Sequence, residues 1–460
     1  MSSAPDTRAP LEVNHQTTGT PGNGWRRVLG IPSLVLLGLV YMVPLTIFST
    51  YGIVVELNGG RLSAAYAAAL VVMLFTARSY GRMAKAFPLG GSAYTYATRS
   101  FGPGLGFLAG WSLLLDYLLL PMINYLLIGI YLNAAFPAVP AWLFIVVSIV
   151  AVTVLNLVGI TAVARANYVV VGLQGLFIVL FVVLASVSVT GAGTVDLLAP
   201  FTGVDGAEGF SPIMAGAAIL CLSYLGFDAV STFAEEAKDP RRTIPRAIML
   251  TTVLAGLIFL ALAYISHQLL PVGSFASPDS AAIEVVGKAG GNLLVAFFTA
   301  AYIAGSLGSA LTSQASVSRI IHSMGRSGVL PGVLGRLHSR LGTPVVPIVL
   351  TSAVALLALV LDLTTVSSLI SFGALVAFSV VNLSVIKHYF INGKQRGPGG
   401  LLNNLLLPGT GLVLTLWLWT SLSGLSFSLG LSWAGLGLVY LAVLTRGFRR
   451  PTPHLELEGA

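Results

Sequence analysis

SLVLLGLVYMVPLTIFSTYGIVV, residues 33–55, is an uncharged apolar run with a proline at its centre. A helix needs about 20 mostly apolar residues to cross the hydrocarbon core of a bilayer, and this run is long enough. Pro44 lacks a backbone N–H and clashes with the turn before it, so we expect a break near Met42–Thr46. The stretch therefore predicts a membrane protein whose first spanning helix is interrupted at mid-depth.

The rest of the chain has the same apolar character. Of its 460 residues 56% are hydrophobic and only 9% charged, whereas soluble domains carry about 25% charged residues. We predict an all-α membrane protein with about twelve transmembrane helices within residues 28–446, a disordered cytoplasmic tail at 1–27 and a second tail at 447–460. The predicted spans are 33–55, 63–80, 105–134, 140–160, 167–190, 211–233, 247–270, 290–316, 345–362, 366–390, 404–422 and 426–445.

The basic residues alternate with these spans. If the N-terminus is cytoplasmic, every Lys and Arg except Arg61 and Lys288 falls in a cytoplasmic segment. Such a bias sets membrane orientation, so we expect both termini on the cytoplasmic side of the inner membrane. The net charge of +8 is then a topology signal rather than a sign of nucleic-acid binding.

A second interruption lies in the sixth span, at Ser223-Tyr224-Leu225-Gly226-Phe227-Asp228. If spans 1–5 and 6–10 are two halves, this break corresponds in position to the one near Pro44. Paired interruptions point to the substrate site of transporters built from inverted repeats. A plain proline kink and a tolerated glycine are the alternative.

Only two acids, Asp116 and Asp228, lie well inside the spans, and no Lys or Arg lies at mid-depth. Each acid costs roughly 2.5–3.5 kcal/mol on insertion scales. The missing partner is then a cationic substrate, a proton or a metal ion, unless hydroxyls or helix N–H groups satisfy the acids. The candidate substrate-binding residues are Val43, Pro44, Thr46, Asp116, Tyr117, Ser223, Tyr224, Gly226 and Asp228.

Two further groups are candidates for coupling or gating. Glu235 and Glu236 begin a charged run that forms either an inner gate or a solvated connector. Hydroxyls on the eighth span, among them Ser309, Thr312 and Ser313, either coordinate a cation or join helices. The chain has no phosphate-binding loop, no H-E-x-x-H and no paired cysteines. We therefore expect that the protein is not an enzyme and that it holds neither a metal ion nor a cofactor.

Three runs resemble the amino acid–polyamine–organocation superfamily: FPLGGSAYTYATRSFGPGLGFLAGW (87–111), LGFDAVSTFAEEAKDPRRTIPRAI (225–248) and RIIHSMGRSGVLPGVLGRLHSRLGTPVVP (319–347). The resemblance implies a 5+5 inverted repeat with discontinuous helices 1 and 6. Within the superfamily, VPLTIFSTYGIV (43–54) and WSLLLDYLLLPMINYLL (111–127) resemble the putrescine-importer type.

Two departures from the superfamily pattern bear on function. Amino acid members usually have Gly-Ser-Gly in helix 1, whose N–H groups hold the substrate carboxylate, where this chain has Val43-Pro44-Leu45. A diamine has no carboxylate to hold. Many proton-coupled members have a lysine in helix 5, whose charge stands in for a sodium ion. This chain has Gln174 there, which makes Gln174 a candidate coupling residue and leaves the coupling ion open.

These features predict a secondary active importer of a small amine such as putrescine, coupled to H⁺ and working by alternating access. An amino acid permease or exchanger on the same fold is the first alternative. A transporter-like sensor or non-transporting subunit is the second.

Overall fold

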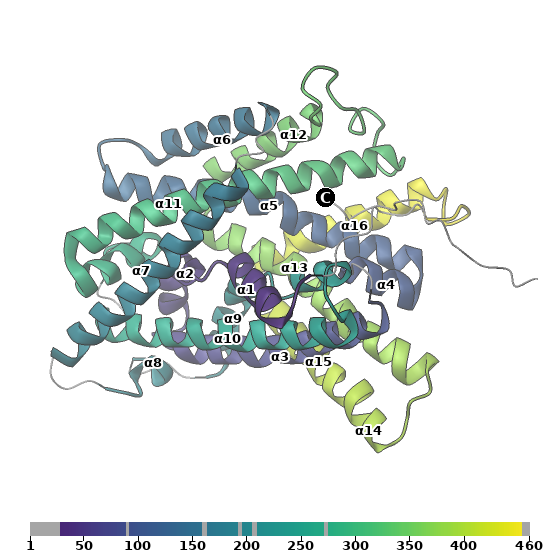
Figure 1. The fold of residues 1–460 in the computed structure, drawn as a ribbon, viewed down its shortest axis with the longest axis horizontal. Coiled ribbons are helices and arrows are strands. Elements are labelled where there is room, and N and C mark those ends of the chain that lie inside the picture. Colours follow the sequence, from purple (N-terminus) through teal and green to yellow (C-terminus); the bar gives the residue numbers. More distant parts are fainter. Residues whose placement is uncertain are drawn as a thin grey trace, which may run out of the picture.

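The computed structural model describes residues 28–88, 92–158, 163–191, 196–204, 209–270 and 275–452, which form a bundle of helices (Figure 1). The helices of the first part are α1 (Ile31–Met42), α2 (Thr46–Leu57), α3 (Leu62–Ala86), α4 (Ala93–Phe101), α5 (Pro103–Ala135), α6 (Ala141–Val158), α7 (Val163–Gly191) and α8 (Ala199–Thr202). Those of the middle part are α9 (Ser211–Tyr224), η1 (Ala229–Glu235), α10 (Pro240–Leu269), η2 (Pro278–Ser280) and α11 (Ala281–Arg326). The last are α12 (Val345–Ala355), η3 (Leu356–Leu359), α13 (Leu363–Val385), η4 (Ile386–Asn392), α14 (Pro398–Leu401), η5 (Leu402–Leu406), α15 (Leu407–Thr420) and α16 (Gly424–Leu444).

The predicted all-helical membrane fold is confirmed. In the described ranges, ten helical segments are long and apolar enough to cross a membrane, and the bent pair α1 and α2 makes an eleventh. At the predicted ninth span the structure has a shorter apolar segment, Val345–Leu359. The count of twelve therefore remains a prediction. The predicted tail at 1–27 lies outside the described residues, as do residues 453–460 of the second tail.

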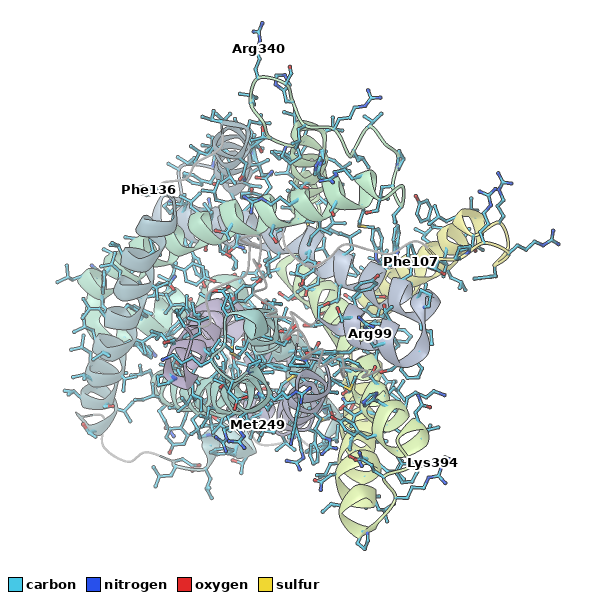
Figure 2. The ribbon with its side chains drawn as sticks, turned by 45° about the vertical axis from the view of Figure 1, so that its right-hand side comes forward. Arg99, Phe107, Phe136, Met249, Arg340 and Lys394 are labelled. Carbon is cyan, nitrogen blue, oxygen red and sulfur yellow. The ribbon has the colours of Figure 1, made fainter. Side chains whose placement is uncertain are left out.

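Contacts between loops sort the helix ends into two groups. At one end, the N–H of Lys238 donates to the carbonyl of Leu29 (3.1 Å), next to the start of α1. At the other end, Arg61 donates to the carbonyl of Gly209 (2.7 Å), joining the starts of α3 and α9. Figure 2 shows the side chain of Arg340 projecting outward from the loop after α11.

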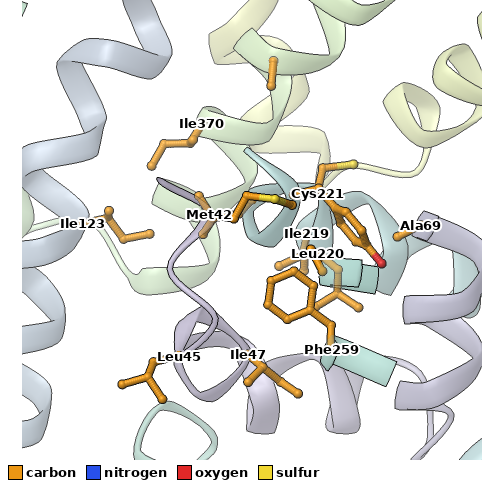
Figure 3. Packing of buried hydrophobic residues seen from close by; sticks show 14 of the residues in the cluster. Met42, Leu45, Ile47, Ala69, Ile123, Ile219, Leu220, Cys221, Phe259 and Ile370 are labelled. Carbon is orange, nitrogen blue, oxygen red and sulfur yellow. The ribbon is translucent and has the colours of Figure 1, made fainter. Parts of the chain in front are cut away.

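An aromatic cluster packs α2 against α7 and α11. Phe48 makes edge contacts with Phe177, Phe181 and Phe298, with ring centroids 5.8, 5.2 and 5.3 Å apart. Such pairs contribute about 0.5–1.5 kcal/mol beyond the burial of their area. Figure 3 shows further buried side chains around the end of α1 and the start of α2, among them Met42, Leu45 and Ile47. The half-helix after the first break is therefore held by tight apolar packing.

Gln314 of α11 is the centre of a buried hydrogen-bond network. Its side-chain oxygen accepts from Nδ2 of Asn156 (2.9 Å) and from the hydroxyl of Tyr125 (3.3 Å). Its Nε2 donates to Oγ of Ser352 (2.6 Å), which also bonds to the hydroxyl of Thr153 (2.7 Å). The network joins α5, α6, α11 and α12, and polar bonds of this kind are a main source of cohesion between helices in lipid.

Replacing Gln314 by Leu should destabilise the protein, because it removes the acceptor of Asn156 and Tyr125 and the donor to Ser352 from the buried network. We expect a loss of about 1–3 kcal/mol and a lower midpoint of thermal unfolding in detergent. Gln268→Leu is the matched control, since Gln268 makes its hydrogen bond to Asp196 at the protein surface. Equal midpoints for the two variants would contradict the role of the network.

Candidate substrate-binding site

The first break joins α1 to α2 and bends the pair by 52°. Val43 has φ 45° and ψ 86°, a left-handed conformation that is rare for a β-branched residue. Pro44 follows and has no N–H to continue the helix. The hydroxyl of Thr46 donates to the carbonyls of Met42 (3.1 Å) and Val43 (2.5 Å). The predicted interruption is present, and the chain's own groups satisfy part of the backbone that it frees.

The second break follows α9, which ends at Tyr224. Gly226 has φ 124°, a conformation that side-chain-bearing residues rarely adopt. Asp228 then precedes the 3₁₀-helix η1, and its Oδ1 accepts from the N–H of Gly226 (3.2 Å). The predicted interruption of the sixth span is therefore also present, and the carboxyl group of Asp228 is hydrogen-bonded to the backbone of this break.

The two breaks touch each other. A Cβ added at Gly226 would lie 2.9 Å from Cδ1 of Tyr41 and 3.1 Å from the backbone nitrogen of Met42. About one turn earlier on α1, a Cβ at Gly38 would lie 2.7 Å from a methyl group of Val230 on η1. Glycine at both positions allows α1 to pack closely against the second break and η1.

Asp116 lies on α5, across from α13, and is only 8% exposed. A Cβ at Gly373 of α13 would lie 3.3 Å from Cβ of Asp116, so the two helices meet closely here. Among the described residues no hydrogen bond or ion pair to the Asp116 carboxyl group is formed. The acid is thus buried without a partner.

Five polar side chains share this region. Asp116 interacts electrostatically with Asp228, and both acids interact with the hydroxyls of Tyr41, Tyr80 and Tyr117. Tyr41 is 53% exposed although it contacts the second break, so it borders accessible space rather than packed core. Within the described part of the chain, neither acid is paired with a Lys or Arg. The arrangement offers a cation two acids and the aromatic rings of Tyr41 and Tyr117.

Sequence reasoning did not single out Tyr80. Its hydroxyl is buried and has no hydrogen-bond partner in the described structure, and its ring packs edge-on against Phe227 and Phe378. Nothing in the local sequence marks this tyrosine, because only the packing of α3 against the second break brings it to the acids.

The hydroxyls of Ser223 and Tyr224 make contacts with α3, and their role in substrate binding stays a prediction. The hydroxyl of Ser223 lies 3.2 Å from that of Tyr66, and the hydroxyl of Tyr224 donates to the Tyr66 carbonyl (3.3 Å). The ring of Tyr224 also packs edge-on against Phe259 of α10. These two side chains join α9 to α3 and α10.

The three hydroxyls of α11 mostly bond within their own helix. Thr312 is exposed and donates to the carbonyl of Gly308, and Ser313 donates to that of Ser309. Only the hydroxyl of Ser309 makes a contact between helices, accepting from Nδ2 of Asn124 on α5 (3.1 Å). The structure does not gather these groups into one site, and their coupling role stays a prediction.

The remaining gating candidates lie at two other places. Gln174 is buried between α7 and α11, where a Cβ at Gly305 would lie 2.0 Å from its Nε2. Glu236 accepts the N–H of Leu29 with its carbonyl (3.0 Å), which ties the start of α1 to the end of η1. The side chain of Glu235 lies outside the described structure.

Comparison with known proteins identifies the family of this fold and site. The family model described as amino acid permease matches residues 33–437, nearly the whole helical domain. The chain belongs to the amino acid permease family. It is accordingly a multi-pass membrane protein, and its family and relatives are transporters rather than enzymes.

Several relatives are similar over almost their full length. The chain is 42% identical to the low-affinity putrescine importer of Escherichia coli (strain K12), covering 94% of this chain and 96% of the relative. It is 28% identical to a branched-chain amino acid permease of Bacillus subtilis (strain 168), over 92% and 93% of the two chains. A methylthioribose transporter of the same organism is 27% identical, over 90% and 92%.

The contact between the two breaks gives a test of the site. Gly226→Ala adds a methyl group against Tyr41 and Met42 and requires a strained φ. Strain of this kind is of order 1–3 kcal/mol, so we expect substrate uptake to fall by about 5-fold or more. Uptake is measured in cells at equal amounts of membrane-inserted protein.

Gly172→Ala on α7 is the control, because a Cβ there meets nothing within 4 Å. Uptake by Gly226→Ala at the level of this control would show that the close approach of the breaks is not needed for transport.

Proposed function

We propose that the chain is a secondary active importer of a small dicationic amine, with putrescine as the leading candidate. The observation that carries the proposal is a pair of interacting acids, Asp116 buried on α5 and Asp228 partly buried at the second break, without a basic partner among the described residues. A charged group at that depth is unfavourable unless it is neutralised. A diamine supplies one ammonium group for each acid.

The ends of the broken helices favour a cation as well. Both α1 and α9 end at the breaks, and a helix C-terminus carries the negative end of the macrodipole. The hydroxyls and rings of Tyr41, Tyr80 and Tyr117 lie in the same region. Aromatic faces attract ammonium groups by cation–π interaction.

The backbone donors at the breaks argue against a substrate carboxylate. The N–H of Val43 bonds to the carbonyl of Val40 and that of Thr46 to the carbonyl of Val43, while Pro44 has none. The N–H of Gly226 bonds to Asp228. Few N–H groups are left at the breaks to hold an amino acid by its carboxylate.

The comparisons support this substrate class, since the 42% identical relative is named a putrescine importer. We further propose that H⁺ is the coupling ion and enters together with the amine. Transport would proceed by alternating access within a 5+5 inverted repeat, whose corresponding helices 1 and 6 carry the two breaks. Both termini would face the cytoplasm, as the distribution of Lys and Arg predicts.

Neutralising either acid tests the proposal. Removing one partner of a buried charge pair costs about 2–5 kcal/mol, so Asp116→Asn and Asp228→Asn should each lower putrescine uptake at least about 30-fold. The measurement is initial uptake of labelled putrescine, under a fixed pH gradient, into proteoliposomes holding each purified variant.

Glu56→Gln is the matched control, since Glu56 is an exposed acid at the end of α2. It should keep most of the uptake, as its carboxyl group lies at the protein surface. Undiminished uptake in both Asp→Asn variants would overturn the assignment of the two acids as counter-ions.

An amino acid permease is the second candidate, favoured by the similarity to the branched-chain amino acid permease. The two functions differ in whether the substrate needs a free α-carboxylate. If the chain is an amino acid permease, leucine would compete for uptake and n-butylamine would not. Asp116 and Asp228 would then be structural or proton-handling groups.

A further inference from the structure

A cleft lies between α3 and α10, away from the helix breaks. It has a volume of about 190 Å³ and is lined by Arg78, Gly81, Arg82, Lys85, Pro245 and Met249. The two helices cross closely here, since a Cβ at Gly81 would lie 3.2 Å from Cα of Pro245. Figure 1 shows α3 and α10 running side by side, and Figure 2 labels Met249 on this side of the bundle.

The surface inside the cleft is almost entirely apolar, and three of the residues that border it are basic. Arg78, Arg82 and Lys85 are spaced four and three residues apart, so they lie on one face of α3. None of the lining residues is acidic, and Pro245 and Met249 form an apolar wall. Such a cleft suits an anion attached to an apolar chain.

The arginines are held in place by neutral groups. The guanidinium of Arg82 stacks over the ring of Tyr389 (4.3 Å to its centroid) and donates to Oδ1 of Asn404 (2.5 Å). Arg78 donates to Oδ1 of Asn403 (2.5 Å). The Nε of Arg82 is buried and has no partner in the described structure. These contacts orient the guanidinium groups but leave their charge uncompensated.

The surface beside the cleft is apolar and exposed. On α3, Val71 precedes Arg78 by seven residues and therefore lies on the same face, with 49% of its surface exposed. On α10, Val253 follows Met249 by four residues, so it lies on the same face as Pro245 and Met249, and it is partly exposed. Acyl chains can follow this surface from the cleft toward the middle of the membrane.

We propose that this cleft binds the phosphodiester headgroup of an acidic phospholipid. Basic clefts between transmembrane helices near the membrane surface bind anionic headgroups. Arg78, Arg82 and Lys85 neutralise the phosphate at the rim of the cleft, while Pro245, Met249 and Val253 contact the glycerol and acyl portions. The site is separate from the amine site at Asp116 and Asp228 and does not depend on the substrate proposed above.

Native mass spectrometry of the detergent-purified protein tests this site, with phosphatidylglycerol and phosphatidylcholine offered in equal amounts. Wild-type protein should retain phosphatidylglycerol preferentially. The double variant Arg78→Gln/Lys85→Gln should bind it about 5-fold more weakly for each charge removed, which corresponds to ~1 kcal/mol per basic residue near an anionic lipid. Arg82 is left intact because it also holds Tyr389 and Asn404.

Arg241→Gln/Arg246→Gln is the matched control, since it removes two exposed charges of α10 that do not line the cleft. It should bind phosphatidylglycerol as the wild type does. Equal losses in the two double variants would mean general surface attraction and would overturn the proposal. Displacement of the lipid by millimolar inorganic phosphate would assign the cleft to a soluble anion instead, which also overturns it.

Discussion

A backbone break or a carboxyl group in the middle of a membrane has no water to bond to, and the structure around the site depends on this constraint. Each unsatisfied polar group there is costly, so irregular backbone survives only inside protein or beside a hydrated space. The chain meets the constraint by placing its two breaks against each other. Gly226 contacts the end of α1, and Thr46 and Asp228 bond to the turns that expose backbone groups.

The two breaks are also connected at one end of the bundle. Leu29 pairs through its backbone with Glu236 and Lys238, which joins the start of α1 to the segment after η1. Gly38 packs on Val230 between this pairing and the contact at Gly226. With three points of attachment, α1 and η1 are suited to move as one body. In the proposed mechanism, neutralising the two acids with a diamine favours the closed arrangement of this body around the substrate.

Much of the architecture could be predicted from the sequence because its causes are local. Length and apolarity fix the spans, Pro44 fixes the first break, and Gly226 with its neighbouring acid marks the second. The directions of side chains near the breaks depended on tertiary packing. Ser223 and Tyr224 point to Tyr66, whereas Tyr80, which no local pattern marks, comes to the acids from α3.

Uptake of labelled putrescine by purified wild-type protein in proteoliposomes, with unlabelled compounds as competitors and an imposed pH gradient, tests the central claim most directly. The account predicts uptake that collapses with the gradient and is blocked by diamines, more weakly by n-butylamine with its single ammonium group, and not by leucine. Absence of putrescine uptake, together with exchange of labelled leucine, would contradict it.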